Sequence, residues 1–391
     1  MAAAGVGGAG ERVMTARILV GDVFDKLREL PDESVHCVVT SPPYWGLRDY
    51  SVAGQIGLEP TVGEHIEVMV RVFREVRRVL RKDGTVWLNY GDCYHNIRTH
   101  MQGGANRATR HQGLKEKDLC MMPARLAIAL QEDGWWIRSE IIWAKPNPMP
   151  ESVTDRPTSS HEKVFLLTKS ARYFYDSEAV RVPAARPDWR DESDSVTTNP
   201  CRNDGGNTKR NPKRDKQTRR GSTPRHDGAN LRNVWHIATR SYPGAHFATF
   251  PPALVEPCIK AGTSEKGVCP ECGVPWVRET ETGELSGEAK IHTHGRPAAD
   301  ERGVSGSSAL RTNGRTWREI KTLGWSLSCE CGGVPVPAVV LDLFAGSGTV
   351  GLVADRLDRD SILIELNPDY AEMARQRLDA DGGMFSKTEI A

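Results

Sequence analysis

The chain has 391 residues, a hydrophobic content of 38% and a formal net charge of +1. A chain of this length can bury one large core, or one core with a smaller appended domain. The balanced charge excludes a uniformly basic nucleic-acid binder, so contact with a polyanion must come from local clustering. No stretch reaches the roughly 18 apolar residues of a membrane span. The 9 cysteines are scattered, which excludes a disulfide framework and favours an intracellular, reducing compartment.

Residues 1–15 lack the basic start and long apolar run of a secretory signal, and we expect a disordered extension there. Residues 16–180 alternate between strand and helix patterns, which predicts an α/β layer structure. We expect strands at residues 16–22, 35–40, 85–90, 136–143 and 164–168, and helices at residues 65–80 and 123–132.

Apolar periodicity disappears in residues 181–232, where Arg, Lys, Asp, Asn, Gly and Pro dominate, and this predicts a loop-rich insertion. The α/β pattern resumes in residues 233–266 and is interrupted by a cysteine-bearing insertion at residues 267–335. It ends with a strand–helix–strand unit in residues 336–380, and residues 381–391 are predicted to form a tail.

The last unit carries a ligand-binding pattern. The apolar strand at residues 339–343 runs into a turn with Gly346 and Gly348, where the backbone can approach a ligand closely. The helix that follows, at residues 350–357, offers free N–H groups at its start. A second strand ends at Glu365, at the roughly 20-residue spacing where an acidic side chain reaches the hydroxyls of a ribose. The pattern predicts a nucleotide-bearing cofactor; the alternative is an ordinary βα turn with glycine for packing.

The tetrapeptide Ser41-Pro42-Pro43-Tyr44 follows the apolar strand at residues 35–40, at the carboxyl end where α/β folds place ligands. The prolines lack N–H groups and fix the backbone, so their carbonyl oxygens are aimed rigidly. The Ser41 Oγ and the Pro42 carbonyl could accept the hydrogens of an exocyclic amine on a base. That would favour the pyramidal form whose lone pair attacks a methyl group. Tyr44 could stack on a base flipped out of DNA. The alternative is a rigid turn without chemistry.

These motifs together resemble the S-adenosylmethionine-dependent amino-methyltransferases of DNA. Ser-Pro-Pro-Tyr is similar to their catalytic motif, and residues 342–349 are similar to their cofactor motif. The catalytic motif comes first, which is the circularly permuted order of the family's β class. The match also includes Gly21-Asp22, residues 143–152 and residues 246–251, and together these segments cover most of residues 17–378.

The resemblance implies a Rossmann-like methyltransferase fold, which is an α/β fold with a mostly parallel twisted sheet and helices on both faces. A target-recognition insertion and a small zinc-knuckle insertion would interrupt it. Ser41, Pro42, Pro43 and Tyr44 would form the catalytic site. The residues implied to bind S-adenosylmethionine are Asp22, Phe250, Pro251, Asp342, Phe344, Gly346, Gly348, Thr349 and Glu365, with Phe250 and Pro251 near its methionine end.

The first residue of the catalytic motif bears on the target base. Members of the family that methylate cytosine N4 usually have serine there, and members that methylate adenine N6 usually have aspartate or asparagine. Ser41 therefore favours cytosine N4, with adenine N6 as the alternative. Methylation at cytosine C5 needs a cysteine nucleophile beside a proline, whereas Cys37 lies inside an apolar strand and is expected to be a packed thiol.

A basic run lies where the family carries its target-recognition region. Its members are Lys209, Arg210, Lys213, Arg214, Lys216, Arg219 and Arg220, with Asp215 as the only acid inside the run. Such residues could contact phosphates and read base edges of double-stranded DNA; the alternative is a solvated loop. The resemblance also implies a bacterial or phage-encoded cytoplasmic protein, a monomer or homodimer, with a cognate restriction endonuclease as a further partner encoded elsewhere.

Two close cysteine pairs, Cys269/Cys272 and Cys329/Cys331, predict a structural zinc site, because four thiolates suit tetrahedral Zn²⁺. Methyl transfer from a sulfonium needs no metal, although the zinc module could help to grip DNA. Free surface thiols are the alternative, and His292 or His294 could replace a ligand.

Two other functions are compatible with parts of the sequence. Enzymes that methylate a glutamine amide in proteins also use a Pro-Pro-Tyr motif, but they begin it with asparagine and carry the cofactor motif upstream. A zinc-bearing nucleic-acid binding protein with an inactive methyltransferase fold is expected to have lost motif residues. This chain keeps Ser41, Tyr44, Asp342, Gly346 and Gly348.

Overall fold

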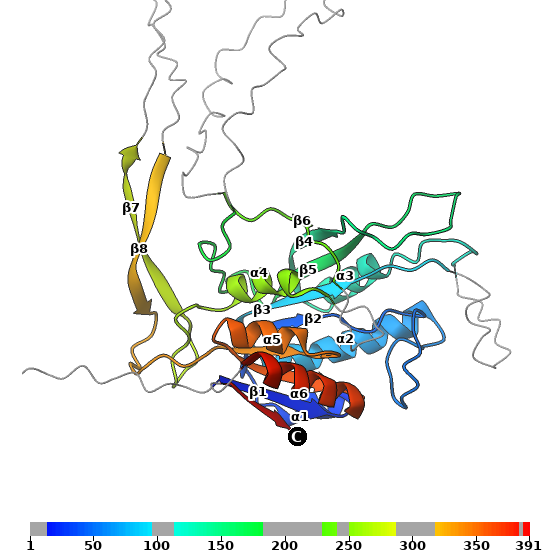
Figure 1. The fold of residues 1–391 in the computed structure, drawn as a ribbon, viewed down its shortest axis with the longest axis horizontal. Helices are drawn as coiled ribbons and strands as arrows, with labels where there is room; N and C mark the ends of the chain where they lie inside the picture. The colour runs from blue at the N-terminus through cyan, green and yellow to red at the C-terminus, as the bar shows by residue number, and fades with distance from the viewer. Residues whose placement is uncertain (1–13, 96–112, 183–228, 241–249, 287–316, 383–385) are drawn as a thin grey trace, which may run out of the picture. The chain divides into compact units, whose positions relative to one another are not determined.

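The computed structural model describes residues 14–95, 113–182, 229–240, 250–286, 317–382 and 386–391 (Figure 1). Contacts divide the chain into two compact units. The larger unit takes in the chain up to Val180, Arg232–Val277 and Trp325–Ala391. The smaller unit takes in Arg181–Leu231 and Arg278–Gly324. Both the predicted insertion and the smaller unit thus begin at residue 181.

The larger unit is built on one sheet of nine strands, in the order β11-β1-β10-β9-β2-β3-β5-β4-β6. The strands are β1 (Met14–Val20), β2 (Val35–Thr40), β3 (Leu80–Tyr90), β4 (Trp136–Ala144), β5 (His161–Thr168), β6 (Val234–His236), β9 (Val339–Asp342), β10 (Asp360–Glu365) and β11 (Ser386–Ile390). A separate two-stranded sheet pairs β7 (Trp276–Ser286) with β8 (Trp317–Leu327).

The large sheet is mostly parallel. The pairings from β11 across to β3 are parallel, β5 runs antiparallel to both β3 and β4, and β4 is parallel to β6. All strands except β5 therefore point their carboxyl ends to the same edge, and β5 begins at that edge. Chain order reverses between β9 and β2, which is the kind of switch point where open α/β sheets bind ligands.

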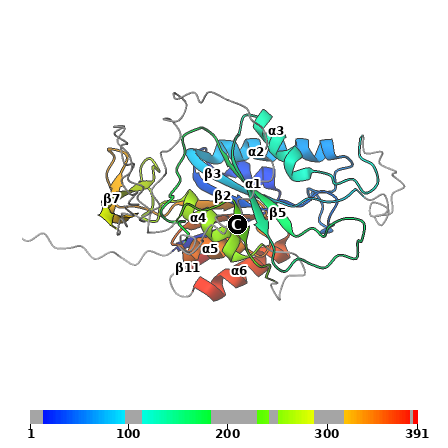
Figure 2. The same ribbon diagram turned by 90° about the horizontal axis from the view of Figure 1, so that it is seen from above.

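Helices cover both faces of this sheet. They are α1 (Val23–Glu29), α2 (Val62–Val79), α3 (Met122–Glu132), α4 (Pro252–Gly262), α5 (Thr349–Arg356) and α6 (Pro368–Gly382). Figure 2 shows α2 and α3 on one side of the sheet and α4, α5 and α6 on the other. α1 packs beside α2, which extends the first layer. Among the described residues, no helix is both long and apolar enough to cross a membrane.

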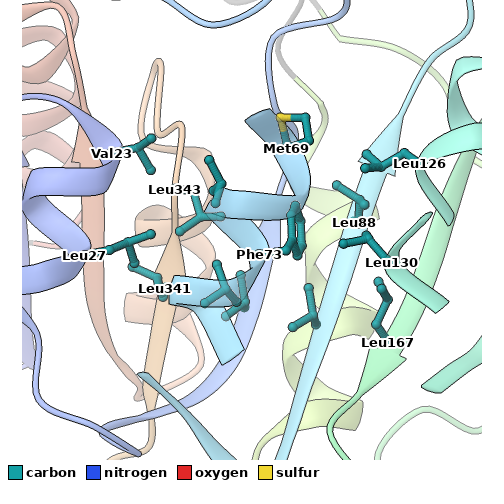
Figure 3. Packing of buried hydrophobic residues seen from close by; sticks show 14 of the residues in the cluster. Val23, Leu27, Met69, Phe73, Leu88, Leu126, Leu130, Leu167, Leu341 and Leu343 are labelled. Carbon is teal, nitrogen blue, oxygen red and sulfur yellow. The ribbon is translucent and has the colours of Figure 1, made fainter. Parts of the chain in front are cut away.

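The core between α1, α2, α3 and the sheet follows from helical periodicity. Thr61 and Glu64 form a reciprocal capping box that fixes the start of α2. Met69 and Phe73 of α2 are fully buried and recur one turn apart, so they project onto the same face. Figure 3 shows both of them between side chains of α1 on one side and of α3 on the other, such as Leu27 and Leu130.

Most predicted elements agree with the structure to within a few residues, and some differ for clear reasons. β3 begins at Leu80, five residues before the predicted start of this strand at residue 85, because parallel pairing with β2 already aligns Leu80 with Val35. The segment predicted as a tail contains β11, which pairs with β1 and forms one edge of the sheet. At the border of the smaller unit, Val182 and Ala229 exchange two backbone hydrogen bonds of 3.0 and 2.8 Å, so the two ends of the predicted insertion meet.

The centre of the sheet depends on one buried hydroxyl. The Thr40 Oγ1, at the end of β2, donates to the Asp342 Oδ1 at 2.8 Å and accepts from the Leu343 N–H at 3.3 Å. We predict that Thr40→Val lowers the free energy of unfolding by about 1–3 kcal/mol, because a buried donor and acceptor lose their partner. Thr40→Ser keeps the hydroxyl and should lose less. Urea unfolding followed by tryptophan fluorescence measures both, and equal stability of Thr40→Val and wild type would contradict the assigned role.

Candidate active site

The residues predicted from the sequence gather at the carboxyl edge of the sheet. Asp22 follows β1, Ser41 follows β2, and Asp342 and Glu365 are the last residues of β9 and β10. Because β2 and β9 are neighbours, the bond between Thr40 and Asp342 joins the two motifs directly, 302 residues apart in the chain. The fold therefore brings the catalytic and cofactor motifs together.

A pocket of about 990 Å³, including its open mouth, lies at this edge. Asp22, Phe344, Gly346 and Glu365, all predicted to bind the cofactor, line it, and Pro43 of the catalytic tetrapeptide lines it as well. The catalytic tetrapeptide thus borders the cavity that the cofactor motif forms.

The acid that ends β10 is held by backbone groups of the pocket. The Glu365 Oε2 accepts from the Gly346 N–H at 2.7 Å, and the Oε1 accepts from the Asn367 N–H at 2.9 Å. Burial raises the pKa of Glu365 above its ordinary value, and these two bonds oppose the rise. Each carboxylate oxygen keeps one further acceptor position, which suits a pair of ligand hydroxyls.

Other residues of the predicted cofactor set lie outside the pocket wall. Gly348, in the left-handed region at φ +72°, begins α5, and an added Cβ would come within 2.9 Å of the Ala374 Cβ, so this glycine allows close packing of α5 on α6. Thr349 is buried and accepts from the Arg377 guanidinium at 3.0 Å. Phe250 lines a second, much smaller pocket together with Thr40 and Asn89.

Asp342 is 1% exposed, and burial raises its pKa to about 7 although Thr40 and the Phe344 N–H donate to it. Its Oδ2 has no hydrogen-bond partner among the described residues. A buried acceptor that lacks a donor is costly. Asp342 itself is not among the residues that line the pocket, whereas the next residue, Leu343, is.

The catalytic tetrapeptide is part of a polar network. The Ser41 Oγ donates to the Tyr44 hydroxyl at 3.4 Å, and that hydroxyl donates to the Glu162 Oε2 at 2.7 Å. The Asn89 Nδ2 contacts all three acceptors, at 3.2 Å from Ser41 and 3.0 Å from both Tyr44 and Glu162. Lys145 forms an ion pair with the other oxygen of Glu162.

The ring of Tyr44 is braced from the core side. The ring of Tyr90 meets it edge-on with centroids 5.2 Å apart, and a Cβ added at Gly91 would lie 2.4 Å from the Tyr44 Cε2. Burial, followed by the nearby Glu162 carboxylate, raises the pKa of Tyr44 well above its ordinary value. The Tyr44 hydroxyl therefore stays protonated and acts as a donor to Glu162.

Comparison with known families identifies the family of the chain that carries this site. The family model described as DNA methylase, of the N6/N4 type, matches residues 35–269 and 335–376. The chain belongs to this family of DNA methylases.

Relatives of the DNA methylase match it over most of its length. The type II methyltransferase M.SmaI of Serratia marcescens is 36% identical over 373 residues, which cover 93% of this chain and 91% of the relative. M.Cfr9I of Citrobacter freundii is 37% identical over 375 residues, covering 94% and 88%. A solved structure, the cytosine-N4-specific PvuII DNA methyltransferase, aligns with a TM-score of 0.51 at 15% identity, covering 97% of this chain and 98% of that chain, and shares the fold.

Membership confirms three predictions from the sequence: the methyltransferase fold, DNA methyltransferase activity and S-adenosylmethionine as methyl donor. The described residues fit this cofactor. Glu365 offers acceptors for the ribose, and Phe344 offers an apolar wall. The β-class permutation and the role of each site residue stay predictions.

The DNA methylase has site residues that sequence reasoning missed. Tyr50, Gln55, Asn367 and Tyr370 line the pocket. The first two come from a loop after the tetrapeptide that folds back, with the Gly46 N–H donating to the Gly57 carbonyl at 2.8 Å. Asn89, Lys145 and Glu162 of the polar network were missed too. A charged residue at the start of the apolar strand β5 was the available signal for Glu162.

Cys37 takes no part in the chemistry of the site. It is fully buried in β2, and burial raises the pKa of its thiol to about 12. A protonated, inaccessible thiol cannot serve as the nucleophile that cytosine C5 methylation requires, so the interpretation as a packed residue is confirmed.

The four predicted zinc ligands lie together. The Sγ atoms of Cys269, Cys272, Cys329 and Cys331 lie within 4.8 Å of one another. Sulfurs bound tetrahedrally at about 2.3 Å from zinc would be about 3.8 Å apart, so a small adjustment would suffice for binding. All four belong to the larger unit.

This cysteine knuckle attaches to the edge of the sheet opposite Ser41. The Arg81 guanidinium, near the start of β3, donates to the Cys272 carbonyl at 2.8 Å. The His36 Nδ1 accepts from the Val339 N–H at 3.0 Å, so its Nε2 carries the proton and donates to the Gly273 carbonyl at 3.2 Å. Burial and then Arg81 lower the pKa of His36 to about 4, which keeps this link neutral.

Other predicted residues lie outside the described residues. They are the basic run Lys209, Arg210, Lys213, Arg214, Lys216, Arg219 and Arg220, and the two histidines His292 and His294. Their predicted roles are neither supported nor opposed by the structure.

We predict that Glu365→Ala weakens the binding of S-adenosylmethionine about 10–100-fold, the cost of losing hydrogen bonds to a charged acceptor. Glu365→Gln keeps one acceptor oxygen, so its affinity for S-adenosylmethionine should lie between those of Glu365→Ala and wild type. The control is Glu256→Ala, which removes an exposed acid of α4 that pairs with Lys260. Titration calorimetry gives the three dissociation constants, and a value for Glu365→Ala equal to that of the control would rule out the ribose role.

Proposed function

We propose that this DNA methylase is a site-specific enzyme that methylates cytosine N4 in double-stranded DNA, with Ser41, Pro42, Pro43 and Tyr44 as its catalytic residues. The observation that carries the proposal is the junction of the two motifs. Thr40, directly before Ser41, is bonded to Asp342 of the cofactor motif, and Pro43 lines the pocket. A methyl donor in that pocket would lie beside the tetrapeptide.

The residues of the tetrapeptide have separate roles in this proposal. The Ser41 Oγ and the Pro42 carbonyl accept the hydrogens of the target amine, which localises its lone pair for in-line attack. Tyr44 stacks on the flipped base, and its ring is already braced by Tyr90 and Gly91. When S-adenosylmethionine is bound, its sulfonium supplies the methyl group.

Ser41 carries the choice of cytosine N4 over adenine N6. The first position of the motif is a neutral hydroxyl here, as is usual in family members that act on cytosine N4. Adenine N6 remains the alternative, because adenine presents an exocyclic amine of the same kind.

The same proposal includes the setting in which the enzyme works. Two relatives that match over most of this chain are named as type II methyltransferases, one from Serratia marcescens and one from Citrobacter freundii. We therefore propose a cytoplasmic modification enzyme that protects a short DNA sequence from a cognate endonuclease, and that contacts DNA through the basic run in residues 209–220.

Expression in a bacterium that lacks DNA methylation tests the reaction. We expect N4-methylcytosine in hydrolysed host DNA, confined to one short sequence when the DNA is sequenced for modified bases. Ser41→Ala and Tyr44→Ala should leave the DNA unmodified while the purified variants still bind S-adenosylmethionine. N6-methyladenine instead would establish the alternative base. Wild-type levels of modification by both variants would refute the catalytic roles.

We also propose that Cys269, Cys272, Cys329 and Cys331 hold one structural zinc ion. Their sulfurs are close enough for a closed tetrahedral site, and such a site needs no open position for chemistry. The knuckle contacts the sheet at the edge away from Ser41, through Arg81 and His36. The proposed zinc therefore stabilises the fold and stays apart from methyl transfer.

We predict about one zinc ion per purified chain, as a closed four-thiolate site requires. Cys269→Ser should lose the metal and lower the melting temperature, whereas Cys93→Ser, which changes a thiol outside the cluster, should keep it. Elemental analysis and thermal unfolding provide the measurements. Wild-type protein prepared without chelators that contains no zinc would exclude the site.

A further inference from the structure

The polar network around Ser41 contains two residues whose hydrogen bonds are almost fully assigned. A serine hydroxyl has one donor and two acceptor positions. The Ser41 donor goes to Tyr44, and one acceptor position takes the Asn89 amide. The Tyr44 hydroxyl donates to Glu162 and accepts from both Ser41 and Asn89. Among the described partners, one acceptor position on the Ser41 Oγ remains free.

Glu162 sets the direction of all these bonds. A carboxylate can only accept, so the Tyr44 hydroxyl must point its hydrogen at Glu162, and the Ser41 hydroxyl must then point at Tyr44. The same carboxylate fixes the Asn89 amide. A flipped amide would turn Oδ1 toward Glu162, where two acceptors would repel, so Nδ2 faces the network and Oδ1 is left without a described partner.

Lys145 fixes Glu162 in turn. The Nζ of Lys145, which follows β4, is paired with the Glu162 Oε1, and both side chains are only 18% exposed. Their shielding from water makes the direction of each bond energetically significant. Glu162 reaches this place because β5 runs antiparallel, so that its first residues lie at the edge where the parallel strands end.

We infer that Glu162, held by Lys145, is a positioning residue that forces Ser41 to present a lone pair to the target amine. This inference rests on the proposed role of Ser41. A serine hydroxyl free to rotate could equally offer its hydrogen to the amine, and it would then compete for the lone pair that has to attack. Glu162 excludes that orientation through Tyr44, without touching the base.

The amide variant Glu162→Gln tests the inference because it should reverse the direction of the hydrogen bonds from Tyr44 and Ser41 while the side chain keeps nearly the same shape. Lys145 can only donate, so it would hold the glutamine oxygen and turn the glutamine N–H groups toward Tyr44 and Asn89. The Tyr44 hydroxyl would then accept from the glutamine and donate to Ser41, which fills the free position. We expect kcat to fall about 100-fold, the cost of one misdirected hydrogen bond at a reacting centre. The KM for DNA and the affinity for S-adenosylmethionine should stay unchanged.

The double variant Glu162→Gln/Lys145→Met separates direction from structure. Without Lys145, the glutamine oxygen is free to face Tyr44 again, so we expect kcat to recover at least about 10-fold relative to Glu162→Gln. Glu140→Gln is the matched control, because Glu140 and Lys163 form a 2.5 Å ion pair between the same two strands. It should keep wild-type kcat.

The assay uses DNA from a methylation-free bacterium and S-adenosylmethionine labelled in its methyl group, with melting temperatures recorded for every variant. Wild-type enzyme is measured first; a failure to label DNA would count against the proposed function itself. If wild type is active, wild-type kcat in Glu162→Gln overturns the inference. The inference is also overturned if the loss of kcat in Glu162→Gln is accompanied by a loss of cofactor affinity or of folded protein, and if kcat does not recover in the double variant.

Discussion

Parallel pairing of β2 with β9 is the constraint on which the active site depends. These strands come from opposite ends of the sequence, yet Cys37 and Val38 lie in register with Val340 and Leu341. At the end of this pairing, the Thr40 hydroxyl bonds to Asp342, so the catalytic loop and the cofactor loop leave the sheet side by side. A parallel sheet places every strand end at one edge, and two distant motifs become one site without a long connection between them.

The reversed strand β5 completes that edge in a way a purely parallel sheet could not. A parallel β5 would end, rather than begin, beside Tyr90, and a residue at its start would lie at the far edge of the sheet. Antiparallel pairing with β3 puts Lys163 opposite Tyr90, and Glu162 is its neighbour. Glu162, the acid that orients the hydroxyls of the site, thus lies at this edge because β5 runs antiparallel to its neighbours.

The sequence allowed much of this arrangement to be predicted. Apolar runs that lead to Ser41, Asp342 and Glu365 identify the carboxyl ends of strands, whichever neighbours those strands pair with. It did not allow Glu162 or Lys145 to be assigned. Each is a single charged residue beside a strand, and its meaning depends on which strands pair and in which direction. Gly348 has a structural role that the motif alone did not indicate: its close approach to Ala374 allows α5 to pack on α6.

The paired ends of the insertion have a consequence for how such an enzyme can change. Two backbone hydrogen bonds join Val182 to Ala229, so the predicted insertion begins and ends at neighbouring points of the backbone. The entropic cost of closing a loop grows only slowly with its length. The residues between these two positions can therefore be exchanged for a longer or shorter cassette while the strands on either side keep their register. If this segment makes the proposed contacts with DNA, new sequence preferences could evolve there while the catalytic and cofactor motifs stay unchanged.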